Sequence, residues 1–135
     1  MIKPGSLRTA LLQHLPDIAN DPQKLLIFAE RGRVITTGAA GNSWEYAYQL
    51  TVIVQDYAGD MNALTATVVR WLAETQPDLL LSPEAMRNAV RFEAELMTNE
   101  LADVQFQLDV TETVIGRGDA FEQPAPPPSD PTALW

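Results

Sequence analysis

Residues 44–54 read WEYAYQLTVIV, and this stretch decides the fold. Large apolar side chains occupy every second position, whereas the positions between them are polar or small, with Ile53 as the exception. A repeat of two residues is that of a β-strand with one face on a core and the other toward solvent or a partner. The stretch therefore predicts a long strand in a sheet with two unlike faces.

Shorter strands are predicted on both sides of this stretch. Residues 25–29 are apolar and residues 34–37 are β-branched, so we predict a hairpin that turns at Arg31-Gly32. Residues 90–97 and 104–111 alternate in polarity, and residues 99–103 between them predict a second hairpin loop. The sheet is therefore expected to be mostly antiparallel.

Two helices are predicted from their capping residues and apolar stripes. Ser6 is expected to cap a first helix, which ends near His14 or continues into a second short turn, because Pro16 disfavours helical geometry before it. Asp60 is expected to cap the next helix, and Pro77 to end it. The apolar stripe of this second helix consists of Met61, Leu64, Val68, Trp71 and Leu72.

A short third helix is predicted from Ser82 as its cap and Pro83 at its first position. Just before it, residues 79–81 are three leucines in a row, which something must cover. Together these elements predict an α+β domain over residues 1–116, a mostly antiparallel sheet with two to three helices packed on one face.

The last segment, residues 117–135, is predicted to be a flexible, acidic, proline-rich tail. It holds five prolines and few apolar residues, so it cannot bury enough surface to offset its ordering entropy. An extended, polyproline-like arm is expected. The terminal Trp135 is either an incidental feature of a free end or an assembly anchor that docks into a neighbouring subunit.

Composition excludes several classes of protein. The chain has no cysteine, so disulfides and thiolate chemistry are absent, and it has neither a membrane-spanning apolar run nor the apolar stretch of a signal peptide. Synthesis in the cytosol is expected. The formal net charge of −9 makes nucleic-acid binding unfavourable. This charge either keeps the protein soluble or lets DNA pass close by without sticking.

No catalytic constellation, cofactor motif or metal site is predicted. The one histidine, His14, lies in a predicted helix, where a lone histidine is seldom a catalyst. Asp56 and Asp60 are four residues apart and could hold a divalent cation, although a turn former and a helix cap explain them more simply. Glu93 and Glu95 share the polar face of one strand, which suits solvent or a basic partner better than acid–base catalysis.

An ordered series of segments resembles the phage tail completion proteins of the P2 gpR type. The resemblance covers about residues 1–115, and the proline-rich tail lies outside it. Its segments are Lys3-Pro4-Gly5-Ser6-Leu7-Arg8, Leu15-Pro16, Pro22-Gln23-Lys24-Leu25, Phe28, Gly32-Arg33-Val34, Glu45-Tyr46-Ala47-Tyr48-Gln49-Leu50, Asp56-Tyr57-Ala58-Gly59-Asp60, Trp71-Leu72, Gln76-Pro77-Asp78-Leu79-Leu80 and the closing hairpin up to Thr113.

The resemblance implies a structural virion protein that completes or terminates a contractile tail at its head-proximal end and helps join head to tail. It implies a ring, most simply a homohexamer, that contacts tail tube or sheath and head–tail connector proteins, with DNA nearby and no membrane. Two rival hypotheses remain open. One is a small enzyme or regulator with a metal at Asp56 and Asp60, and the other is a monomeric protein-binding module whose proline-rich tail is a ligand.

Overall fold

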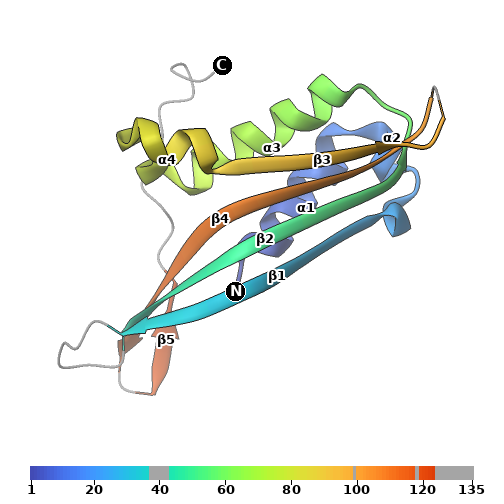
Figure 1. The fold of residues 1–135 in the computed structure, drawn as a ribbon. Coiled ribbons are helices and arrows are strands. Elements are labelled where there is room, and N and C mark those ends of the chain that lie inside the picture. The colour runs from blue at the N-terminus through green and yellow to red at the C-terminus, as the bar shows by residue number, and fades with distance from the viewer. Residues whose placement is uncertain (37–42, 99, 118, 124–135) are drawn as a thin grey trace.

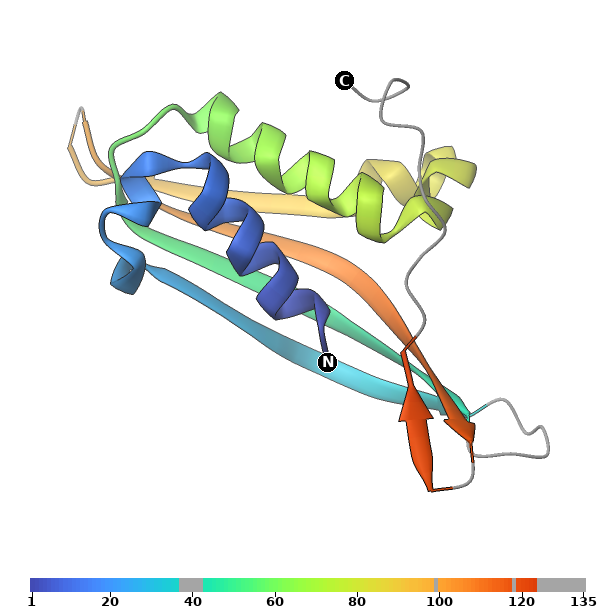
Figure 2. The same ribbon diagram turned by 180° about the vertical axis from the view of Figure 1, so that it is seen from behind.

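A computed structural model describes residues 1–36, 43–98, 100–117 and 119–123 of the chain. Its centre is an antiparallel sheet with strand order β1-β2-β4-β3, and the helices lie across one face of this sheet (Figure 1, Figure 2). The predicted class, α+β with a mostly antiparallel sheet and helices on one face, is confirmed.

The strands of the sheet differ in length. The predicted long strand is β2, Trp44–Tyr57, which pairs with β1, Leu25–Thr36, on one side and with β4, Ala102–Arg117, on the other. The edge strand β3, Val90–Leu96, pairs with the first half of β4, as the predicted second hairpin requires. Because β3 is short, β4 extends well beyond it.

The predicted hairpin of residues 25–37 is wrong. Residues 25–36 form one strand, β1, and the register against β2 shifts between Glu30 and Arg33. Arg31 has a φ of 53°, so the residues that look like a turn form a bulge within the strand. A bulge and a tight turn favour the same residue types, so residues 31 and 32 alone do not distinguish them. The bulge forms here because β1 pairs with β2 on both sides of it.

The N-terminal helix α1, Lys3–His14, begins earlier than predicted and ends where predicted. Ser6 is not its cap: it lies within the helix, and its Oγ accepts a hydrogen bond from Trp71 Nε1 at 3.0 Å. The second short turn that Pro16 suggested exists as α2, Pro16–Ala19, and a 3-10 helix, η1, follows at Pro22–Lys24.

The second predicted helix is α3, Met61–Thr75, and its cap is confirmed, since Asp60 Oδ1 accepts from Asn62 N at 2.9 Å. A 3-10 helix, η2, Pro77–Leu81, follows, and Leu81 is 86% exposed rather than covered. The predicted third helix is α4, Pro83–Asn88, capped by Ser82, whose Oγ accepts from Ala85 N.

The core lies between the sheet and the helices α1 and α3. Trp71 is 4% exposed. The apolar side chains of the neighbouring strands β2 and β4 lie side by side beneath both helices. The fully enclosed side chains come from α1, α2, α3 and three strands: Leu7, Leu11, Ile18, Leu25, Leu50, Val52, Val54, Leu64, Val68, Val104, Phe106 and Leu108.

Gly59 lies at the corner where β2 turns into α3. A Cβ at this position would lie 2.5 Å from Asp17 Oδ2 and 2.6 Å from the hydroxyl of Tyr57, which donates to Asp60 O. A larger residue would therefore have to displace the side-chain ends of Asp17 and Tyr57, whereas glycine leaves both in place.

The C-terminal segment begins as part of the fold. Residues Ala120–Glu122 form a short strand, β5, that pairs with the end of β4, so the predicted boundary after Gly116 precedes this strand. Arg117 Nε and Glu122 Oε2 form an ion pair of 2.7 Å across it. Residues 124–135, with most of the predicted tail and Trp135, lie outside the described residues.

We expect Trp71→Ala to lower the free energy of unfolding by about 3–5 kcal/mol, because a large buried side chain is lost and leaves a cavity. The matched control is Val69→Ala on the same helix, where the side chain is 47% exposed and the change should be small. Chemical denaturation of both variants measures the difference. Equal midpoints for the two variants would contradict the assigned core.

Candidate functional site

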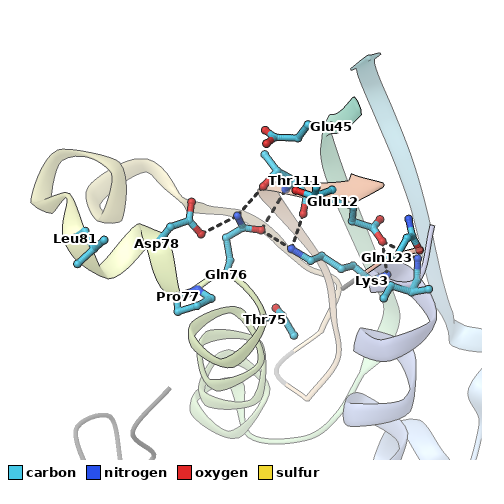
Figure 3. A pocket seen from close by; sticks show the side chains of 12 residues that line it. Lys3, Glu45, Thr75, Gln76, Pro77, Asp78, Leu81, Thr111, Glu112 and Gln123 are labelled. Carbon is cyan, nitrogen blue, oxygen red and sulfur yellow. Dashed lines mark hydrogen bonds between the residues drawn. The ribbon is translucent and has the colours of Figure 1, made fainter. Parts of the chain in front are cut away.

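A hollow of about 510 Å³ lies between the start of α1, the end of α3 and the second half of β4 (Figure 3). We call it the α1–α3–β4 hollow. Polar side chains gather along it, in contrast to the apolar core beside it. The residues that form its hydrogen-bonded floor are Lys3, Gln76, Thr111 and Glu112.

Glu112 connects β4 with the start of α1. Its carboxylate is buried, and Oε1 accepts from the backbone N–H of Ile2 at 2.7 Å and of Lys3 at 3.4 Å. Oε2 accepts from the hydroxyl of Tyr48 on β2 at 2.5 Å. The first turn of α1 has no acidic residue and no side-chain cap of its own, so a carboxylate from β4 satisfies its free N–H groups.

Gln76 and Lys3 bind the backbone of β4 at Thr111, just past Leu108, the last residue of β4 that pairs with β3. Thr111 N donates to Gln76 Oε1 at 3.1 Å, and Gln76 Nε2 donates to Thr111 Oγ1 at 2.8 Å. Lys3 Nζ donates to Gln76 Oε1 at 2.6 Å and to the carbonyl oxygen of Thr111. These side chains therefore take the place that a neighbouring strand would have at Thr111 (Figure 3).

Burial dominates the electrostatics of the hollow. Burial lowers the pKa of the Lys3 ammonium below its ordinary value, and the negative charges of Glu112, Asp78 and Glu45 oppose this shift in part. Burial also raises the pKa of the Tyr48 hydroxyl, and its hydrogen bond to Glu112 adds to the shift. Tyr48 is therefore a neutral donor to a carboxylate at physiological pH.

The hydrogen bonds of these groups are used within the fold. Both oxygens of Glu112 and both polar atoms of Gln76 have partners in α1, β2 or β4 or in the neighbouring Asp78. Among the described residues, no buried side-chain nitrogen or oxygen lacks a hydrogen-bond partner. The arrangement connects α1, β2, β4 and the end of α3, and this is the role of a structural cluster.

The residues that the sequence suggested for chemistry lie apart from this hollow. His14 is exposed at the end of α1 and lines a separate hollow between α1 and α3. Asp60 is a helix cap, and Asp56, with a φ of 49°, donates its backbone N–H to Asp103 Oδ1 at 2.9 Å. Glu93 and Glu95 are exposed on β3, so the structure brings none of these groups together with Lys3 or Glu112.

Sequence reasoning missed the cluster around Glu112, although one signal was present. The alternation of β4 continues through Val104, Phe106, Leu108 and Val110, and Glu112 then occupies the next position on the same apolar face. A carboxylate on a buried face requires hydrogen-bond donors. Its position therefore predicts a buried polar contact, but not that the donors come from the chain's first residues.

The described residues show neither of two other kinds of site. They contain no group of three or more histidine or acidic side chains placed to hold a metal ion. No described helix is both long and apolar enough to cross a membrane.

The fold and the hollow define a small α+β domain whose main polar cluster holds secondary-structure elements together. The family model described as P2 phage tail completion protein R (GpR) matches residues 1–124. The chain is also 35% identical over 134 residues to tail completion protein R of Escherichia phage P2, and this similarity covers 94% of the chain and 86% of the relative. The chain therefore belongs to the GpR family of phage tail completion proteins, which confirms the resemblance. No solved structure gives a significant match.

We expect Glu112→Ala to destabilise the protein by about 1–3 kcal/mol, because Ile2 N–H and the hydroxyl of Tyr48 lose their acceptor. Tyr48→Phe should then cost less in the Glu112→Ala background than in the wild type. A double-mutant cycle followed by chemical denaturation measures this coupling.

The matched control for the cycle is Glu122→Ala, which removes an exposed ion pair and should change stability by about 0–1 kcal/mol. Additive effects of the changes at Glu112 and Tyr48 would show that this hydrogen bond does not stabilise the fold.

Proposed function

We propose that this protein is a structural subunit that completes a contractile phage tail at its head-proximal end and helps join head to tail, as a ring and most simply a homohexamer. The observation that carries the proposal is membership of the GpR family across residues 1–124. The similarity to tail completion protein R of phage P2 over most of both chains supports it.

The charge of the protein is consistent with a position beside passing DNA. The net charge of −9 repels the phosphate backbone, so a ring of such subunits would not retain DNA that moves through it. The partners in this proposal are further copies of the chain, tail tube or sheath proteins and head–tail connector proteins.

Trp135 is the proposed anchor of the C-terminal segment on a neighbouring subunit. The twelve residues 124–135 include five prolines and end in Leu134-Trp135. A segment of this composition in polyproline geometry reaches about 37 Å, at ~3.1 Å per residue. A terminal aromatic side chain supplies a large contact area at a protein interface.

Electron microscopy of tails tests the location. We expect a density of several subunits at the head-proximal end of wild-type tails, and tails without this feature and without heads when the gene is deleted. Complementation with the wild-type gene is the control. Tails that join heads normally without the protein, or a single copy at the tail end, would refute the proposal.

A separate comparison tests the anchor. Ending the chain after Gln123 retains β5, so we expect an unchanged melting temperature but a lower yield of complete particles. Trp135→Ala should reproduce the loss of yield, whereas Ser129→Ala in the same segment should not. Full yield from the truncated chain would remove Trp135 from the assembly.

A further inference from the structure

The strands β1 and β3 lie at opposite edges of the sheet (Figure 1). Within the described residues neither edge is covered by another strand, whereas β4 is covered at Thr111 by Gln76 and Lys3. Soluble proteins usually protect strand edges, because an open edge can pair with another chain. The protection of β4 shows that this fold covers one edge, and the bare edges of β1 and β3 therefore require an explanation.

Each bare edge has an exposed apolar side chain on the face that the helices cover. Val34 of β1 pairs in register with Tyr46, and it is 57% exposed. Phe92 of β3 pairs with the buried Phe106 and is 62% exposed, with the two ring centroids 6.2 Å apart. A strand placed beside either edge would cover these side chains and extend the core.

The two edges have opposite charges on the other face. Arg33 pairs with Ala47 on the face without helices, and Arg31 lies in the bulge just before it; both are exposed. Glu93 pairs with Gln105 on the same face, and Glu95 follows it by two residues; both are also exposed. Within the described residues, none of these four charges has an ion-pair partner.

From these features we infer that β1 of one copy of this chain pairs with β3 of the next copy, antiparallel and with Arg33 opposite Glu93. The antiparallel direction of this pair follows from the order of the strands in the sheet. Successive strands in the order β1-β2-β4-β3 are antiparallel, so β1 and β3 of one copy run in opposite directions. A neighbouring copy that continues the sheet keeps this direction, so its β1 meets β3 antiparallel.

This register pairs apolar side chains on one face of the sheet and opposite charges on the other. With Arg33 opposite Glu93, an antiparallel pair places Val34 opposite Phe92 on the face of the helices. The bulge at Arg31 interrupts this register, so Arg31 adds positive charge beside the pair without a fixed partner. A slip of one residue would turn the charges toward the apolar side chains, and a slip of two would remove Phe92 from its place opposite Val34.

An interface between two different edges of the same chain repeats from copy to copy, and it forms a ring when the rotation between copies closes. With Arg33 opposite Glu93, neighbouring copies are offset by the distance from Gln105 to Thr111 on β4, so the strands are tilted relative to the ring axis. The inference therefore rests on the proposed ring and specifies the surface that forms it. It also assigns roles to Arg31, Arg33, Glu93 and Glu95, which have no ion-pair partner among the described residues of the subunit.

Paired cysteines test the register directly, because the natural chain has no cysteine. Tails would be assembled with the variant Val34→Cys/Phe92→Cys, oxidised, and analysed on non-reducing gels. We expect a ladder of cross-linked copies that ends at the number of subunits in the ring. A bond within one copy is excluded, because β2 and β4 separate the two edges by roughly 14 Å, three strand spacings.

The off-register control is Val34→Cys/Leu96→Cys, which should give no ladder. A second experiment does not depend on cysteines: Arg31→Glu/Arg33→Glu should lower incorporation into tails, and adding Glu93→Arg/Glu95→Arg should restore it. Tails that contain the protein but give neither a ladder nor a charge rescue would overturn this interface and leave the proposed function intact. A wild-type protein that is absent from tails would overturn both.

Discussion

The carboxylate of Glu112 is the contact on which the arrangement of the fold depends. It connects the first turn of α1, the hydroxyl of Tyr48 on β2 and the strand β4, and all three lie at the same end of the sheet. A buried charge is tolerated when donors surround it, and here the donors fix where the first helix begins. Because α1 covers the sheet beside α3, this side chain helps to hold α1 over the apolar faces of β2 and β4.

The neighbouring contacts of Gln76 and Lys3 give the sheet two kinds of edge. Just past the part of β4 that pairs with β3, the side chains of Gln76 and Lys3 bind its backbone at Thr111 and occupy the place of a strand. The edges of β1 and β3 are not covered by another strand within the described part of the chain, and they differ in charge. In the proposed ring, this difference allows copies to join in one order only, because two identical edges would allow pairing in either direction.

Local patterns predicted most of the fold. The repeat of two in residues 44–54 and the caps Asp60 and Ser82 act over a few residues, so sequence alone reveals them. The bulge at Arg31 and the first turn of α1 could not be predicted in this way. The first depends on pairing with the whole of β2, and the second on an acceptor more than a hundred residues away. The same distance explains why the polar cluster was missed, although the carboxylate of Glu112 in an apolar repeat marked one of its members.

The separation between Ile2 and Glu112 also has a consequence for how the chain is made. The two residues are 110 positions apart, so α1 is synthesised first but gains its acceptor only after nearly all of the chain has left the ribosome. Contacts of such long range form late and slow folding. Until then, the apolar side of α1 has no completed sheet to cover. The synthesis of β4 therefore decides when α1 can take its final position.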